Sequence, residues 1–419
     1  MVTFDRLRVS FYRSLEFIEQ RGLSTYDPYD IKSLKLIAWA LESNSILRLV
    51  LRYGLYSVFF MAPLQTRRLL RIQPRITAEG VAFLAEVYRE YYEFFGHHEA
   101  KRRALFLLSW LMDHVETSKY GIGWGVPYRW IRGSLGAVPP NAPNAHTTAV
   151  CVDVLLNFIS CGWGKAGIDN VVRGAMRFLA NELFFFENEE GLGCFSYTSF
   201  DQIRTCVVNT NADMALVFFR ASLLFHDKRE IYHELGEKLL WFVISEQGED
   251  GSWAYFSKFS NMPTIIDGYH TAMILRSLAQ IYALSRENLS LNGGLVAALT
   301  KTLRKGVSFY VTSLVTKDGR PKFTPHRVYP VDILSCALGL IALSDICEVN
   351  EGMCKELKIK MVIERILNYS LSRMQRKSGE FYYRDYGIKR MRLGSLRWAQ
   401  APMSLALLKV LHVLEGYEE

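Results

Sequence analysis

Residues 247–253 read QGEDGSW, a polar turn with a glycine that ends on a large aromatic side chain, and this stretch decides the fold. Four more segments share the pattern, each directly before a new helical stretch: GIGWGVPY at 121–128, EEGLGCFSY at 189–197, KDGRPKF at 317–323 and KSGEFYY at 377–383. Their aromatic anchors recur at intervals of roughly 60 to 70 residues, and a regular period indicates a repeat architecture. The anchors are Trp124, Phe195, Trp253, Phe323 and Phe381.

Apolar residues at helical spacing fill the chain between these turns. One apolar face runs through residues 168–179, and others run through 235–243, 275–282 and 362–367. Strand patterns are few and short. Each repeat therefore holds two helices. Such hairpins cannot bury their apolar faces alone, so they must stack, either as an open solenoid or as a closed ring.

The spacing Gln247-x-x-x-Gly251-x-Trp253 resembles the repeat of squalene-cyclase-type proteins, and Gln375-x-x-x-Gly379-x-Phe381 is a near-match. In this pattern the Gln caps one helix, the Gly permits a tight turn and the aromatic ring packs on the next helix. The resemblance implies an all-α fold, an (α/α) toroid of about six helical-hairpin repeats, as in terpenoid cyclases and six-hairpin glycosidases. We expect residues 101–419 to form the toroid and residues 1–100 to form an N-terminal helical segment packed on it.

The composition narrows the class of protein. The 419 residues carry a net charge of +8, and 50% of them are hydrophobic, which excludes a disordered chain. There is no secretory signal and no run of about 18 uninterrupted apolar residues, so we expect a cytoplasmic protein without a membrane span. The mild charge and the lack of a recognised module argue against a nucleic-acid partner.

The positive charge is concentrated near the N-terminus. Between Glu42 and Glu79 the chain has no acidic residue but has six arginines interleaved with apolar residues. This pattern predicts an amphipathic basic stretch at residues 46–75 that contacts an anionic membrane peripherally. The alternative is a pair of core helices with a solvated basic edge.

The seven cysteines show no paired spacing such as C-x-x-C and stand mostly among apolar neighbours. We expect buried free thiols in a reducing compartment, forming neither a disulfide framework nor a zinc site.

The residues after each turn open the next inner helix, and in a toroid this end of the ring surrounds the ligand cleft. Aromatic, amide, imidazole and carboxylate groups gather there. Such a mixture suits a sugar, because aromatic faces pack on its C–H surfaces and polar groups bind its hydroxyls. We predict catalytic roles for His146, Tyr197, Asp213, Asp267 and His270. We predict substrate binding by Trp124, Tyr128, Asn144, Asn209, Asn211, Trp253, Tyr255, Tyr269, Asp332, Arg397 and Trp398.

Each of these groups also has a structural interpretation. The aromatic anchors pack repeats together, Asn209, Asn211 and Asp213 suit helix N-caps, and a lone histidine is more often structural. The sequence has no D-x-D-D motif, and DGYHT at 267–271 lacks the cysteine that a prenyltransferase-like zinc site needs. We therefore expect no metal and no cofactor.

Several motifs together resemble the toroid proteins encoded with bacterial and archaeal polysaccharide biosynthesis genes. They include YDPYD at 26–30, GWGVPY at 123–128, CFSY at 194–197 and DGYHT at 267–271. The resemblance covers nearly the whole chain and implies an enzyme or accessory protein that makes or modifies a surface glycan or exopolysaccharide.

The chemistry stays open between two classes of glycan-active enzyme and two alternatives from other classes. A uronate lyase or C5-epimerase needs an acid and a base beside C5, and a glycoside hydrolase needs two carboxylates across the bond. We favour the lyase or epimerase slightly, because Tyr and His outnumber Glu in the predicted cleft. The alternatives are a non-catalytic glycan-binding or scaffold protein, and an isoprenoid-handling toroid with an apolar pocket.

Overall fold

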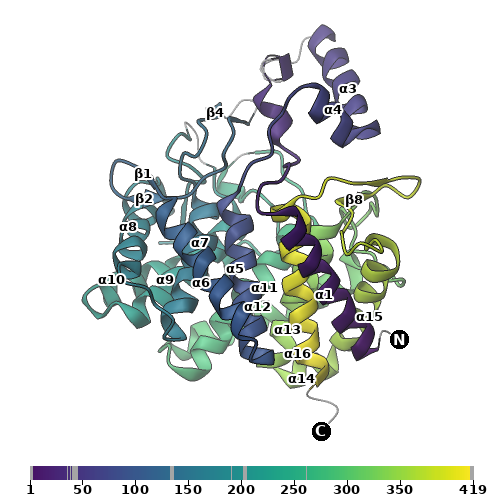
Figure 1. The fold of residues 1–419 in the computed structure, drawn as a ribbon. Helices are drawn as coiled ribbons and strands as arrows, with labels where there is room; N and C mark the ends of the chain where they lie inside the picture. The colour runs from purple at the N-terminus through teal and green to yellow at the C-terminus, as the bar shows by residue number, and fades with distance from the viewer. Residues whose placement is uncertain are drawn as a thin grey trace.

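Six inner helices form a closed ring in the computed structural model, which describes residues 3–34, 36–37, 39, 46–132, 136–189, 191–201, 205–260 and 262–415 (Figure 1). In chain order the inner helices are α5 (Ala78–Phe95), α7 (Ala145–Ser160), α9 (Val208–Leu224), α11 (Gly268–Glu287), α13 (Ile333–Val349) and α16 (Ala401–Glu415). Each packs on the next, and α16 packs on α5, so the ring has no open edge. This confirms the prediction of an all-α toroid.

An outer helix pairs with each inner helix. The outer helices are α6 (His98–Asp113), α8 (Ile168–Asn181), α10 (Arg229–Ser245), α12 (Gly293–Phe309), α15 (Ile359–Tyr369) and α1 (Phe4–Arg21). The sixth hairpin joins the two ends of the chain, because α1 packs on α16. The expected domain boundary at residue 100 falls within α6, which packs on α5 as one hairpin.

Burial distinguishes the two layers. Every residue of α13 from Ile333 to Cys347 is buried, whereas α8 buries mainly one stripe that includes Ile168, Val172 and Leu179. A helix that is apolar all round lies inside a fold, and one with a single apolar face lies on its outside. The apolar spacing in the sequence therefore predicts the outer helices better than the inner ones.

The repeated turns join neighbouring hairpins. Gln247 Nε2 donates to the carbonyl of Thr302 on α12 at 2.9 Å, and Trp253 Nε1 donates to the carbonyl of Val243 at 2.9 Å. Gly251 has φ +91°, and a Cβ there would lie 2.4 Å from the carbonyl oxygen of Lys305, so only glycine fits. Each turn thus holds its own hairpin and the outer helix of the next one.

The last turn closes the ring by the same contacts. Gln375 Nε2 donates to the carbonyl of Ser10 on α1 at 3.0 Å, and a Cβ at Gly379 would lie 2.0 Å from the carbonyl oxygen of Arg13. Helix α1 therefore occupies the position that α12 occupies beside the turn at Gly251.

Ion pairs link the inner helices across the ring. Asp153 on α7 accepts from Arg220 on α9 at 2.6 Å and from Arg276 on α11 at 3.0 Å. Lys409 on α16 lies 3.3 Å from Glu90 on α5 and 3.5 Å from Asp345 on α13. These charges are largely buried, so their partners are needed to offset the cost of removing them from water.

The remaining elements are short, and most of them gather at the end of the ring where the inner helices begin, whereas η3 and α14 follow the ends of α9 and α13 at the opposite end (Figure 1). Three antiparallel strand pairs are β1 (Glu116–Thr117) with β2 (Ile122–Gly123), β3 (Trp130–Ile131) with β4 (Ala137–Val138), and β5 (Phe185–Glu187) with β6 (Gly193–Phe195). A three-stranded antiparallel sheet contains β7 (Val331–Asp332), β8 (Arg384–Asp385) and β9 (Arg390–Met391). The short helical pieces are η1 (Asp30–Ser33), η3 (His226–Lys228), η4 (Lys258–Ser260), α14 (Glu351–Glu356), and the π-helical turns η5 (Tyr310–Leu314), η6 (Ser370–Met374) and η7 (Leu396–Gln400).

Helices α3 (Ile46–Met61) and α4 (Pro63–Leu69) form an arm that stands away from the ring at this same end (Figure 1). Arg67 fastens the arm. Its buried guanidinium donates to both carboxylate oxygens of Asp30 at 3.0 Å and to the carbonyl of Asp27 at 3.1 Å. Among the described residues, no helix is long and apolar enough to cross a membrane.

The expectation of free thiols is wrong for four cysteines. The structure pairs Cys194 with Cys206 and Cys347 with Cys354 as disulfides. In each pair the second cysteine lies beyond the end of the element that carries the first, and the chain folds back to bring the sulfur atoms together. Linear spacing therefore gave no signal of the pairing.

Candidate functional site

A cavity of about 390 Å³ opens where the inner helices begin. Its volume is typical of a small-molecule site. Three of its residues, Asn144, Asp267 and Asp332, are also helix N-caps, whose side chains accept from the backbone N–H groups of Thr147, His270 and Leu334. The cavity therefore borders the N-terminal ends of three inner helices, whose dipoles favour electron-rich groups there.

His270 and Asp267 form a hydrogen-bonded pair in the cavity wall. Nδ1 of His270 lies 2.6 Å from Oδ2 of Asp267, while Oδ1 of the same carboxylate caps α11. This geometry fixes the imidazole ring and leaves Nε2 as the nitrogen that does not face Asp267. The ring of Tyr255 lies 4.4 Å from that of His270 and limits its rotation further.

His146 lies between two carboxylates. Its Nε2 is 3.7 Å from Glu79 and its Nδ1 is 3.3 Å from Asp213. Burial opposes the charged imidazolium, but hydrogen bonding and charge from Asp213 and Glu79 outweigh it and raise the pKa of His146 to about 9. His146 is therefore a protonated donor at neutral pH.

Arg397 organises the side of the cavity next to the YDPYD loop. Its Nε lies 3.1 Å from Asp27 and its Nη1 lies 3.2 Å from Glu79. Tyr128 accepts from Arg397 Nη2 at 3.2 Å and donates to Asp27 at 2.8 Å, and Trp398 Nε1 donates to Asp27 at 3.1 Å. Burial disfavours the guanidinium charge, but Asp27 and the other partners outweigh it and keep the pKa of Arg397 well above its ordinary value.

Aromatic rings and phenols complete the wall. Burial raises the pKa of Tyr128, Tyr197 and Tyr269 well above the ordinary value, so these phenols stay protonated hydrogen-bond groups. Trp130 and Trp398 add broad faces to the same cavity. The buried amide oxygen of Asn209 has no hydrogen-bond partner among the described residues, although Asn209 lines the cavity. It is an acceptor ready for a donor from a ligand.

Most of the predicted site residues line this one cavity: Tyr128, Asn144, His146, Tyr197, Asn209, Tyr255, Asp267, Tyr269, His270, Asp332, Arg397 and Trp398. Asp213 lies behind His146 and is held by Ser277, whose hydroxyl donates to it at 2.7 Å. Its part in the site is therefore to position and charge His146.

Three predicted substrate-binding residues lie elsewhere. The indole N–H groups of Trp124 and Trp253 donate to the carbonyls of Leu111 and Val243, so both rings pack between hairpins. Asn211 is fully buried, and its side-chain amide accepts from the backbone N–H of Phe195 and donates to the carbonyl of the same residue. Trp124 and Trp253 thus have the packing role that was the alternative for them, whereas Asn211 lies inside α9 and is not the helix N-cap that was its alternative.

The structure adds lining residues that sequence reasoning missed: Glu79, Tyr29, Lys32, Trp130 and Arg384. Glu79 is the second residue of α5, the position that corresponds to His146 on α7. Extending the repeat to α5 would have pointed to it. Tyr29 stands in the YDPYD motif, but Lys32 and Arg384 had no comparable signal.

No group of three or more His, Cys, Asp or Glu side chains in the described part of the chain is arranged to hold a metal ion. The expectation of a site without metal or cofactor stays a prediction.

No family model matches the sequence, and no match was found among curated proteins. Solved structures do match. A possible member of the GH105 family from Salmonella enterica aligns with a TM-score of 0.64 over 99% of this chain and 96% of its own, at 11% identity. This chain shares its toroid fold. Cellobiose 2-epimerase from Bacillus thermoamylovorans aligns at 0.61 over 81% and 88%, and a polysaccharide lyase at 0.55 over 81% and 91%, each with 12% identity.

Proposed function

We propose that this protein is a carbohydrate-active enzyme that moves a proton on a sugar, as a uronate lyase or a sugar epimerase does. One observation carries the proposal: two histidines with different partners line the same cavity. His270 is oriented by one carboxylate, and His146 is held charged by two. A base and an acid in one site are what proton transfer at carbon requires.

The two imidazoles take different roles. His270 faces Asp267 through Nδ1, so Nε2 is the nitrogen placed to act as the base that removes a proton from carbon. His146 is the acid, because its Nε2 and Nδ1 both carry protons below a pH of about 9. In a lyase it protonates the departing glycosidic oxygen, and in an epimerase it returns a proton to the opposite face of the carbon.

Positive charge stabilises the carbanion-like state. Arg397 and Arg384 line the cavity, and so does Lys32, whose pKa burial lowers to about 8. Arg397 and Arg384 are bound by carboxylates, whereas the Lys32 ammonium lies over the ring of Tyr29 at 4.5 Å. Lys32 is therefore the cation most available to a sugar carboxylate or enolate oxygen.

The cavity also suits the body of a sugar. Tyr and Trp faces offer packing surfaces, and the amide oxygen of Asn209 offers an acceptor for a hydroxyl. The same charged groups make the isoprenoid alternative unfavourable, because a hydrocarbon would leave Glu79, Asp267 and Arg397 desolvated without gain. The epimerase and the polysaccharide lyase with the same fold support the choice of a carbohydrate as the substrate class.

A second candidate is glycoside hydrolysis. Burial raises the pKa of Asp332, although Arg384 at 2.8 Å opposes the shift, and Asp267 lies in the same cavity. A carboxylic acid with a raised pKa beside an ionised carboxylate is the pairing that hydrolases use.

Incubation in D₂O distinguishes the two chemistries and a binding protein. The probes are polygalacturonate, alginate and cellobiose, followed by proton NMR and by ultraviolet absorbance. The proposal predicts deuterium at one ring carbon or an unsaturated uronate, lost in His270→Asn and kept in Asp250→Asn, whose side chain serves a turn outside the cavity. New reducing ends without deuterium would assign a hydrolase. Binding of a probe without any reaction would assign a glycan-binding protein.

We propose a location on the basis of the cysteines. Disulfides persist mainly in oxidising compartments, so the two pairs favour a location outside the cytoplasm over the cytoplasmic one expected from free thiols. Protein purified with thiols protected from the start and then unfolded should react with a thiol reagent only at Cys151, Cys161 and Cys336. Reaction at all seven cysteines would restore the cytoplasmic assignment.

A further inference from the structure

The outer face of the arm is apolar, although it faces solvent. Val50 is 66% exposed, Tyr53 67%, Val58 52% and Met61 65%, and their spacing places them on one side of α3. The opposite side of the helix packs inward through Phe59, which is 3% exposed. A surface helix normally turns its apolar side to the core, whereas Val50, Val58 and Met61 on this second side are exposed to solvent.

The apolar face continues beyond α3. Leu69 at the end of α4 is 82% exposed, and Ile388 is 95% exposed. Ile388 belongs to the loop whose Lys389 donates to the carbonyl of Met61 at 2.6 Å, so this loop and the arm share one surface. We call Val50, Tyr53, Val58, Met61, Leu69 and Ile388 the apolar patch. A patch of this kind on a monomer marks an interaction site.

The charge beside the patch identifies the partner. Arg68 and Arg71 are exposed, and no carboxylate among the described residues pairs with either. The chain has no acidic residue between Glu42 and Glu79 to offset them. Apolar side chains next to unpaired arginines match the boundary between the acyl chains and headgroups of an anionic bilayer.

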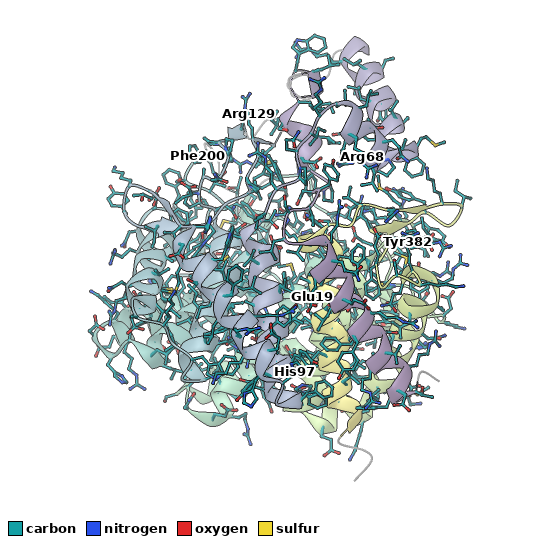
Figure 2. The ribbon with its side chains drawn as sticks, viewed as in Figure 1. Glu19, Arg68, His97, Arg129, Phe200 and Tyr382 are labelled. Carbon is teal, nitrogen blue, oxygen red and sulfur yellow. A yellow bond between two sulfur atoms is a disulfide. The ribbon has the colours of Figure 1, made fainter. Side chains whose placement is uncertain are left out.

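The arm borders the catalytic cavity. A groove of about 440 Å³ lies between the arm and the loop after β8, lined by Tyr56, Phe59 and Phe60 of the arm. Tyr29, Lys32 and Arg384 line both this groove and the central cavity. Figure 2 shows Arg68 on the arm at the same end of the molecule as Arg129 and Phe200, and opposite His97. The arm, the groove and the site therefore lie at one end of the molecule.

We propose that the apolar patch and Arg68 and Arg71 dock the protein on an anionic membrane and hold the mouth of the cavity at that surface. The Arg67–Asp30 contacts fix the docking surface relative to the site. If the proposed function holds, the glycan that reaches the cavity is attached to a lipid of that membrane, and this part of the inference rests on the proposed function. The aromatic groove receives the lipid side of the linkage, and Lys32 and Arg384 meet its anionic group.

Vesicle flotation tests the docking without any turnover, so its outcome is independent of the chemistry. The full chain should float with phosphatidylcholine vesicles that contain phosphatidylglycerol and not with phosphatidylcholine alone. Val58→Asp/Met61→Asp and Arg68→Glu/Arg71→Glu should each weaken binding by about tenfold or more. The matched controls, Ile231→Asp/Met361→Asp and Lys301→Glu/Lys305→Glu, change equally exposed residues on the outer helices and should bind as the wild type does.

Two results would overturn the proposal. One is a flotation result that does not depend on the docking surface: equal flotation with and without phosphatidylglycerol, or equal flotation of the Val58→Asp/Met61→Asp protein and the wild type. The other is sedimentation that shows a dimer lost in Val58→Asp/Met61→Asp, which would assign the patch to a second copy of the chain. Circular dichroism of each variant establishes that it is folded before the comparison.

Discussion

Two histidines of this protein differ because of their neighbours. His270 lies in the first turn of α11, beside the Asp267 carboxylate that caps the N-terminus of this helix. The same Asp267 side chain therefore caps the helix and orients the imidazole ring. His146 stands one position nearer the N-cap on α7, its cap is Asn144, and its carboxylates come from α5 and α9. Neighbouring positions in the repeat therefore place the two histidines among different partners, and the proposed function makes one of them the base and the other the acid.

Asp267→Asn tests the orientation of His270. Asparagine is as good an N-cap as aspartate, so the free energy of unfolding should change by less than about 1 kcal/mol. The imidazole loses its carboxylate partner, and turnover should fall by about a hundredfold or more. Urea unfolding and the D₂O exchange rate measure the two effects. Unchanged exchange in a stable Asp267→Asn protein would mean that the pair is structural.

The pH dependence tests His146. Its folded-state pKa is raised from 6.5 to about 9, so its stabilising contribution is complete below pH 6.5 and is lost as the pH rises through 9. A raise of this size corresponds to about 3 kcal/mol. Turnover should fall over the same range, because the acid loses its proton. In His146→Gln both losses should vanish, and an imidazole that titrates near 6.5 by NMR would contradict the assignment.

Sequence reasoning could place much of the candidate site, since residues that open inner helices follow a repeated turn. It could not separate Trp124 and Trp253 from Trp398. All three are tryptophans near a turn, and only the fold shows whether the indole N–H meets a backbone carbonyl or the carboxylate of Asp27. Nor could it predict the contact between Glu79 and Arg397, because the two residues are 318 positions apart in the sequence.

At the scale of the elements, the repeated turns hold neighbouring hairpins together. A positive φ recurs at Gly191, Gly251, Gly319 and Gly379, and at the last three the turn lies against the backbone of an outer helix. The turn motif was readable in the sequence because this packing leaves no room for a side chain. The arm and the short strands do not belong to the repeat, so the periodic pattern in the sequence did not predict where they lie.

Gly319→Ala separates two effects of that packing. The φ of Gly319 is +84°, and a Cβ there would lie 2.0 Å from the carbonyl oxygen of Arg365. Gly167 has nearly the same φ, +87°, with nothing within 4 Å. Gly167→Ala should cost about 1 to 2 kcal/mol from backbone strain alone, and Gly319→Ala about 2 kcal/mol more. Equal costs in chemical unfolding would show that α15 does not press on the turn.

At the level of the whole molecule, the ring is closed by its two ends. The sequence predicted stacked hairpins, but the pairing of α1 with α16 lies beyond any local pattern, because the two helices stand at opposite ends of the chain. Their shared core and the bond of Gln375 to Ser10 make the N-terminal helix part of the ring.

Phe11→Ala measures how far α1 belongs to the ring. The Phe11 side chain is fully buried, so its truncation should cost about 3 to 5 kcal/mol, as in a central core. Val9 on the exposed side of the same helix is the control, and Val9→Ala should change stability by less than about 0.5 kcal/mol. A small cost for Phe11→Ala would mean that α1 is an appendage and that the ring stays closed without it.

The central claim is that a sugar occupies the cavity between His146 and His270. A crystal structure of the His270→Asn protein with a bound acidic oligosaccharide tests it most directly. The account predicts a sugar ring against the Tyr and Trp faces, with a hydroxyl on the Asn209 amide oxygen and a carboxylate near Lys32. A sugar bound only on the outer surface, or a hydrocarbon chain filling the central cavity, would contradict it.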